Sequence, residues 1–115
     1  RKVVDLGEWW RDETGLPLPL GGNVLHRRHA ERAQELATKL REAIAYALGR
    51  REEGIRHALA YARGLDAVEA GQFIGMYVNH WTLDLGEAGR RAVETLLARG
   101  AAAGLVPVCP SLDWV

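Results

Sequence analysis

Residues 16–26 separate a short tryptophan-containing segment from a long helical one, and they read Leu16-Pro17-Leu18-Pro19-Leu20-Gly21-Gly22-Asn23-Val24-Leu25-His26. In an extended chain, residues two apart direct their N–H groups to the same lateral side. Pro17 and Pro19 have no N–H, so one side of the segment cannot donate hydrogen bonds to a neighbouring strand. The N–H groups of the leucines point to the other side and remain able to pair. The segment therefore predicts an extended crossing with one edge available to a neighbour.

The second half of this segment predicts a buried strand. Leu20, Val24 and Leu25 lie in a run with little polar alternation, which is typical of a strand covered on both faces. Residues 2–6 predict a second, very short strand. Two short strands do not make a stable sheet, so we expect further strands from an upstream part of the protein or from a partner copy. The two glycines after Leu20 suit a hinge or a cleft wall, with an ordinary connector as an equal alternative.

Helix caps and hydrophobic spacing predict helices on both sides of this segment. A short helix begins at Asp5 or Gly7 and ends before Gly15. The apolar spacing then predicts helices over residues 29–49, 51–62, 66–81 and 87–103, with a break at residues 82–85. Asp66 and Glu69 have the spacing of a capping box at the start of one of them. The connecting turns are short, as expected for antiparallel neighbours.

The composition is that of an ordinary globular domain. The chain has 115 residues, with 48% hydrophobic and 26% charged residues, and its 15 basic and 15 acidic residues cancel. Without a basic excess, nucleic acid is not an expected partner. No apolar run approaches the roughly 20 residues of a membrane helix. A single cysteine forms no internal disulfide, so we expect a cytoplasmic protein. The start at Arg1, without a methionine or a signal core, predicts a chain cut from a longer one.

Two groups of residues carry a family resemblance. The first consists of Val4-Asp5-Leu6-Gly7-Glu8-Trp9-Trp10 and Thr14-Gly15-Leu16-Pro17-Leu18-Pro19-Leu20-Gly21. The second consists of Tyr77-Val78-Asn79, Leu83-Asp84-Leu85-Gly86-Glu87 and Gly89-Arg90-Arg91-Ala92-Val93. In this order they resemble the C-terminal half of the 1,4-dihydroxy-6-naphthoate synthase family, which acts on cyclic dehypoxanthine futalosine in menaquinone biosynthesis. The related chorismate dehydratases share the layout. They usually lack the second Leu-Pro, so Pro19-Leu20-Gly21 favours the synthase.

The resemblance implies an α/β, periplasmic-binding-protein-like (type II) two-lobed fold, of which this chain would be a mostly helical C-terminal part with one or two short strands. Residues 1–26 would be the end of the second lobe and the returning crossover strand. Residues 27–104 would be a helical part packing on the first lobe, and residues 105–115 a C-terminal tail. The missing N-terminal portion of the same protein would be the main partner, and a homodimer is left open.

The resemblance also implies a lyase that uses no metal and no redox cofactor, with a histidine as the base. That histidine belongs to a His-Glu-Ser-like stretch upstream of Arg1, so no residue of this chain is assigned a catalytic role and the fragment alone is expected to be inactive. For contacts with the substrate, an aromatic carboxylate, the expected residues are Leu18, Pro19, Leu20 and Gly21. They would supply shape and backbone hydrogen bonds.

Other side chains with chemical potential are better explained by structural roles. His26 and His29 have zinc-like spacing but no third ligand nearby, so an exposed basic turn is the better interpretation. His80 is expected at a helix end, with a cleft contact as the lesser alternative. Of Trp9 and Trp10, one is expected in the core and the other at a cleft or interface. Cys109, between prolines and without a histidine partner, does not indicate a nucleophile.

Two other functions remain open from the sequence. A solute-binding lobe without catalysis has the same expected fold, and fold does not decide function. A free-standing helical interaction module would fold cooperatively by itself.

Overall fold

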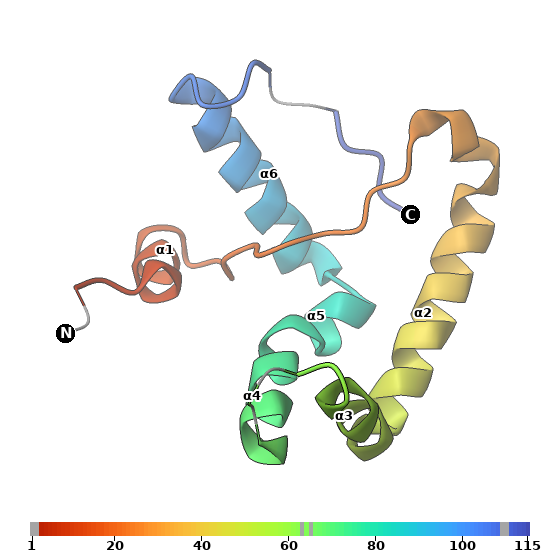
Figure 1. Cartoon of the computed structure of the whole chain (residues 1–115). Helices are drawn as coiled ribbons and strands as arrows, with labels where there is room; N and C mark the ends of the chain where they lie inside the picture. The colour runs from red at the N-terminus through yellow and green to blue at the C-terminus, as the bar shows by residue number, and fades with distance from the viewer. Residues whose placement is uncertain (1–2, 63, 65, 109–110) are drawn as a thin grey trace. The chain divides into compact units, whose positions relative to one another are not determined.

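The computed structural model describes residues 3–62, 64, 66–108 and 111–115, and these residues form helices joined by turns and extended segments. Figure 1 shows the order of the elements along the chain. Their bounds are α1 Leu6–Thr14, η1 Arg27–Arg32, α2 Ala33–Gly49, α3 Arg51–Leu59, α4 Ala67–Tyr77, α5 His80–Leu83 and α6 Gly86–Ala102, where η1 is a 3-10 helix. The helices expected from caps and spacing are present with shifted ends, but η1 and α5 were not expected, and Thr82 and Leu83 of the expected break belong to α5.

The predicted fold class is wrong. The described residues include no strand, whereas an α/β, periplasmic-binding-protein-like fold with short strands was expected. Residues 3–5 precede α1 without forming a strand, and Lys2 lies outside the described residues. Residues 17–26 run without regular structure, and no described residue accepts a hydrogen bond from the N–H of Leu18 or Leu20. Apolar residues and prolines favour extended backbone, but a strand also needs a pairing partner, and the described chain contains none.

The chain divides into two compact units. The first comprises Arg1–Asn23 and Leu85–Trp114, and the second comprises Val24–Asp84 with Val115. The predicted three-part division at residues 26 and 104 stays a prediction.

In the first unit, α6 buries two of its small residues and is followed by a tail that turns back on it. Gly89 and Ala92 are buried. The N–H of Leu105 donates to the carbonyl of Gly100 at 2.9 Å, in a turn that Gly104 makes with a φ of 69°. Further on, the indole of Trp114 donates to a carboxylate oxygen of Glu94 in α6 at 3.2 Å. These bonds hold the described parts of the tail to the helix it follows.

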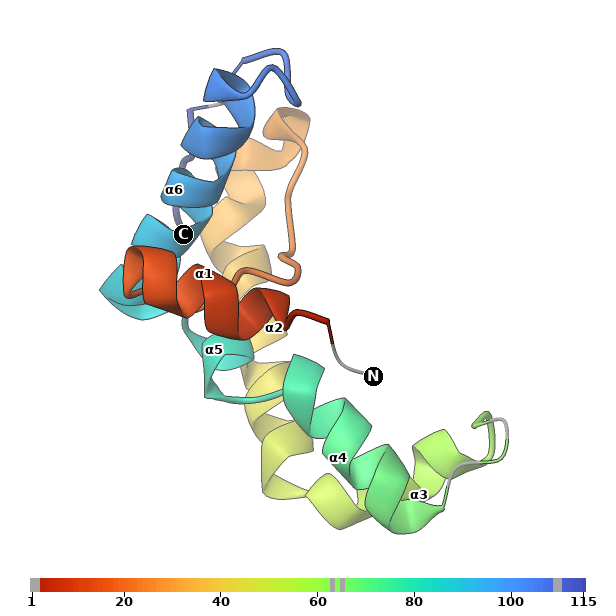
Figure 2. The same ribbon diagram turned by 90° about the vertical axis from the view of Figure 1, so that its left-hand side faces the viewer.

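In the second unit, α3 and α4 form an antiparallel pair whose close approach depends on glycines of α4 (Figure 2). The Arg51 guanidinium donates to the carbonyl of Gly71 at 2.9 Å. A Cβ at Gly71 would lie 3.2 Å from Cδ1 of Ile55, and one at Gly75 would lie 2.6 Å from Nη2 of Arg51. Ala70, on the same helix, is 3% exposed. One side of α4 is therefore covered by α3.

The end of α4 and the start of α5 share one hydrogen-bond network. The amide of Asn79 donates to the carbonyls of Gly75 and Met76, and its oxygen accepts from the N–H of Trp81 at 2.9 Å. Thr82 accepts from the N–H of Asn79 and donates to the carbonyl of Tyr77. The helix expected to continue through residue 81 therefore ends at Tyr77. His80 opens α5 and does not end α4, which corrects its predicted place.

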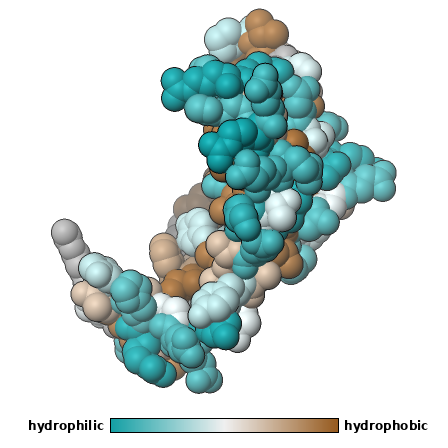
Figure 3. All heavy atoms as spheres, turned by 90° about the vertical axis from the view of Figure 1, so that its right-hand side faces the viewer, coloured by the Kyte–Doolittle hydropathy of each residue, from teal (hydrophilic) through white to brown (hydrophobic). Residues whose placement is uncertain are grey.

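The outer faces of the helices are solvated. Hydrophilic residues cover much of the face drawn in Figure 3, and hydrophobic ones show between them. Exposed ion pairs such as Arg32 with Glu35 and Lys39 with Glu42 run along η1 and α2. Pairs of this kind contribute little to stability, so most of the stability has to come from packing between helices.

The glycines give a matched pair of substitutions. Gly54 in α3 has nothing within 4 Å of an added Cβ, so Gly54→Ala is expected to raise the free energy of unfolding by about 1 kcal/mol. Gly75→Ala is expected to gain close to nothing, because it displaces Arg51 from the Gly71 carbonyl and loses a hydrogen bond worth about 1 kcal/mol. Urea unfolding followed by circular dichroism measures both. In an Arg51→Ala background, Gly75→Ala should stabilise as Gly54→Ala does; equal gains in the unmodified chain would contradict the proposed contact.

Candidate functional site

Trp10 is the anchor of the segment that was expected to contact substrate. It is 3% exposed, on α1. Its indole N–H donates to the carbonyl of Pro17 at 3.1 Å. The guanidinium of Arg99, from α6, lies over its ring at 5.4 Å from the centroid, within the range of a cation–π interaction. The ring therefore connects α1 to α6 and to the start of residues 16–20, which are called the Leu-Pro segment below.

The ends of α1 fix how the chain enters this segment. Asp5 caps the helix by accepting from the N–H groups of Gly7 at 3.0 Å and Glu8 at 3.1 Å. Gly15 ends it with a φ of 68° and donates to the carbonyl of Arg11. The hydroxyl of Thr14 accepts from the N–H of Leu16 at 3.1 Å. The capped helix and the anchored tryptophan together set the path of residues 16–19.

The four expected substrate contacts, residues 18–21, begin on this path and continue beyond it. Leu18 and Pro19 are half-buried, whereas Leu20 is 65% exposed and Gly21 is exposed. Nothing lies within 4 Å of a Cβ added to Gly21, so the backbone there is open to a ligand. No described side chain that titrates lies on this stretch. Their role as substrate contacts stays a prediction.

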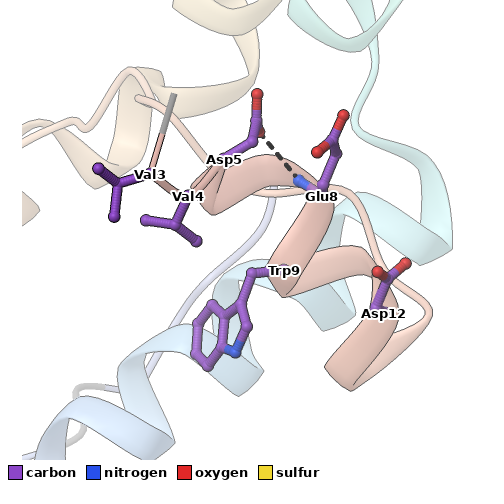
Figure 4. A pocket seen from close by; sticks show the side chains of 6 residues that line it. All are labelled: Val3, Val4, Asp5, Glu8, Trp9 and Asp12. Atoms are coloured by element: carbon purple, nitrogen blue, oxygen red, sulfur yellow. Dashed lines mark hydrogen bonds between the residues drawn. The ribbon is translucent and has the colours of Figure 1, made fainter. Parts of the chain in front are cut away.

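A shallow pocket lies beside α1, away from these four residues (Figure 4). Its volume is about 510 Å³, and its lining consists of Val3, Val4, Asp5, Glu8, Trp9 and Asp12. Figure 4 shows the Trp9 indole projecting to a different side of the helix from the Glu8 carboxylate. Asp5 is engaged as the helix cap. Because the polar groups do not converge on one point, the pocket has no arrangement suited to catalysis.

One of the two adjacent tryptophans is buried, as predicted, and the place of the other at a cleft or interface stays a prediction. Trp10 is buried, and Trp9 is 49% exposed at the pocket. Sequence spacing alone indicated that they face different ways, but not which of them is inside. Arg99, which completes the surroundings of Trp10, was missed because no local pattern connects it with α1.

The histidines with zinc-like spacing are occupied by neighbouring groups. Nδ1 of His26 accepts from the N–H of Arg28 at 3.1 Å, which caps η1. Nε2 of His29 accepts from Nε of Arg28 at 2.9 Å. Among the residues that the structure describes, no three metal-ligating side chains gather at one point. Cys109 lies outside the described residues.

Comparison with known proteins defines the class to which the chain belongs. Residues 1–102 match a family described as menaquinone biosynthesis, and the chain is a member of that family. It is also similar over 92% of its length to a crystal structure of the protein AF1704 from Archaeoglobus fulgidus, with 34% sequence identity and a TM-score of 0.75, covering 40% of that protein.

Two relatives carry the name of an enzyme and show which members of the family the chain is similar to. The chain is 41% identical over 110 residues to a 1,4-dihydroxy-6-naphthoate synthase of Thermus thermophilus, covering 95% of this chain and 40% of that enzyme. It is 41% identical over 107 residues to the enzyme of the same name from Streptomyces coelicolor, covering 92% of this chain and 38% of the relative. The resemblance drawn from the sequence is thus confirmed. The chain spans about two fifths of the length of these relatives.

None of the described helices is both long and apolar enough to cross a bilayer.

The role of Trp10 as an anchor can be tested with its neighbour as control. Trp10→Phe keeps a large ring but removes the bond to Pro17, so the free energy of unfolding should fall by about 1 kcal/mol or more. Trp9→Phe changes an exposed ring and should stay within about 0.5 kcal/mol of the unmodified chain. Urea unfolding by circular dichroism measures the difference. Equal losses of unfolding free energy in the two variants would contradict the role of Trp10 as an anchor.

Proposed function

We propose that this chain is part of a 1,4-dihydroxy-6-naphthoate synthase, a lyase that converts cyclic dehypoxanthine futalosine to 1,4-dihydroxy-6-naphthoate in menaquinone biosynthesis. The observation that carries this proposal is the 41% identity to the Thermus thermophilus enzyme across 95% of the chain. The match includes the Trp9–Trp10 and Leu-Pro segments, since residues 1–102 fit the family. The reaction itself takes place in the full-length protein.

In this proposal, Leu18, Pro19, Leu20 and Gly21 form a wall of the substrate site. The bond from Trp10 to Pro17 holds the start of this stretch. The free N–H groups of Leu18 and Leu20 suit a carboxylate or a carbonyl of an aromatic substrate, because no described residue uses them. Gly21 leaves room for a ligand to approach the backbone. The stretch supplies shape and hydrogen bonds but no proton transfer.

The remaining three fifths of a full-length family protein would supply the catalytic base, so the 115-residue chain alone is expected to be inactive. That remaining part is the proposed main partner, and the substrate is a small molecule. Neither a metal nor a redox cofactor enters the proposed reaction. The cytoplasm is the proposed location, consistent with a chain that has one cysteine. A homodimer remains an alternative arrangement.

A chimera tests the assignment directly. The 110 matching residues of the Thermus thermophilus synthase are replaced by this chain, and formation of 1,4-dihydroxy-6-naphthoate from cyclic dehypoxanthine futalosine is followed by chromatography. The chimera should turn over substrate, while the 115-residue chain alone should not. A folded chimera that binds the substrate without converting it would support a solute-binding role and contradict the proposal.

The substrate wall is tested in the same chimera. Pro19→Ala combined with Gly21→Val should raise KM about tenfold, a loss of about 1.4 kcal/mol in binding, with kcat within about twofold because no base is changed. Gly22→Val is the matched control, since Gly22 is also exposed, with nothing within 4 Å of an added Cβ. Unchanged kinetics in the double variant, or an equal effect of Gly22→Val, would remove the site assignment.

A further inference from the structure

Arg99 is the charged side chain that lies over the buried ring of Trp10. It belongs to the last turn of α6, and its guanidinium is 5.4 Å from the centroid of the ring. Arg99 itself is exposed, whereas Trp10 is 3% exposed. No carboxylate among the described residues forms an ion pair with Arg99. Within the described part of the chain, the indole is therefore the partner that the structure gives to this guanidinium.

The contact acts on the indole N–H as well as on the ring. A cation over an aromatic face is attracted by the electrons of the ring and draws them toward itself. The N–H of the same ring system then carries more positive charge and donates a stronger hydrogen bond, because linked polar contacts polarise one another where little water reaches them. This N–H donates to the carbonyl of Pro17 at 3.1 Å. Arg99 therefore strengthens the bond by which Trp10 holds Pro17.

The carbonyl of Pro17 and the N–H of Leu18 belong to one peptide unit. The unit is planar, and none of the described peptide bonds is cis, so the N–H points away from the carbonyl and from the indole that binds it. A bond that fixes the carbonyl therefore also fixes the direction of the N–H. A polarised carbonyl makes the same N–H a better donor. No described residue accepts a hydrogen bond from it, so the effect of Arg99 reaches a donor that the described chain leaves unused.

A second arginine–tryptophan contact on α6 shows what is particular to Arg99. The guanidinium of Arg90 lies 5.7 Å from the centroid of the Trp114 ring. The indole N–H of Trp114 donates to a carboxylate oxygen of Glu94, an exposed side chain of the same helix. The same two chemical groups are linked there to a side chain of α6 and not to the Leu-Pro segment. Arg90 is therefore a matched control for Arg99.

We infer that Arg99 is a positioning residue for substrate binding. Through Trp10 and the peptide unit of Pro17 and Leu18, it orients and strengthens the Leu18 N–H as a donor to a carboxylate or carbonyl of the substrate. The inference rests on the proposed function, because it assigns the substrate of that function to this N–H. Arg99 itself does not touch the substrate and transfers no proton. Its effect is on binding and not on the chemical step.

Kinetics of the chimera with the Thermus thermophilus synthase test this role. Arg99→Met keeps the length of the side chain and removes its charge, so KM should rise about threefold while kcat stays within about 1.5-fold. Arg99→Lys keeps a cation over the ring, and its KM should lie between the two. Arg90→Met should leave both constants within about 1.5-fold of the unmodified chimera. In a Trp10→Phe background, Arg99→Met should not change KM, because the N–H that transmits the effect is gone.

The NMR signal of the Trp10 indole N–H tests the contact without substrate. In the chimera with isotope-labelled tryptophan, the signal that disappears in Trp10→Phe belongs to Trp10. Arg99→Met should move this signal upfield, because a weaker hydrogen bond and the loss of the cation both shield the proton. Arg90→Met should leave it in place. If the chimera does not fold, the signals of the four tryptophans in the 115-residue chain give the same comparison.

Each other outcome contradicts the inference. Equal KM values for Arg99→Met and Arg90→Met, or a fall in kcat at unchanged KM, would show that Arg99 does not act on binding. A full effect of Arg99→Met in the Trp10→Phe background would show that the indole does not transmit it, and an unmoved Trp10 signal would remove the contact itself. If the unmodified chimera does not convert the substrate, the proposed function fails alone, and the dissociation constant for the substrate replaces KM in the same comparison. A folded chimera that neither converts nor binds the substrate overturns both.

Discussion

The indole N–H of Trp10 donates to the carbonyl of Pro17, and this bond fixes the end of α1 to the segment that follows it. Trp10 is the large side chain that this unit buries within the described residues, and it receives the guanidinium of Arg99 on its ring. A buried indole N–H needs an acceptor. A proline carbonyl in an extended segment is a suitable one, because no helix or sheet uses it. One ring on α1 therefore holds the residue that precedes the stretch from Leu18 to Gly21.

Helix ends could be predicted from the sequence because their signals act within a single turn. Asp5 and Gly15 bound α1, and Asp66 with Glu69 forms the capping box of α4. The boundary between α4 and α5 was missed, because Ile74, Tyr77 and Trp81 continue the apolar spacing through it. The signal was present in Asn79 and Thr82, which have the three-residue spacing of a reciprocal cap. The apolar spacing favours one continuous helix through residue 81, but the hydrogen bonds of Asn79 and Thr82 determine where the helix ends.

The fold class could not be predicted in the same way, because strand formation depends on residues elsewhere. The prolines and leucines of residues 16–20 favour extended backbone, but an extended segment is a strand only when a neighbour pairs with it, and residues 17–20 have no regular structure. The candidate site was predictable only in part for a related reason. Sequence spacing indicated that one of Trp9 and Trp10 is buried, whereas the Pro17 carbonyl and Arg99 that surround Trp10 lie in other segments. Family resemblance identified the relatives correctly and implied a fold that the described helices do not show.

The same reasoning explains why apolar residues alone did not locate the core. In α4, Ala70 is 3% exposed while Phe73 is 52% exposed, although the sequence gives both as members of one apolar helix. A hydrophobic pattern indicates which side of a helix tends to be covered, but apolar atoms also make up much of the surface of a folded protein, so the pattern does not locate the core residue by residue. At Ala70, which is buried next to the glycines that approach α3, pattern and structure agree. Where they disagree, as at Phe73 and Tyr77, the described elements leave about half of an apolar side chain exposed.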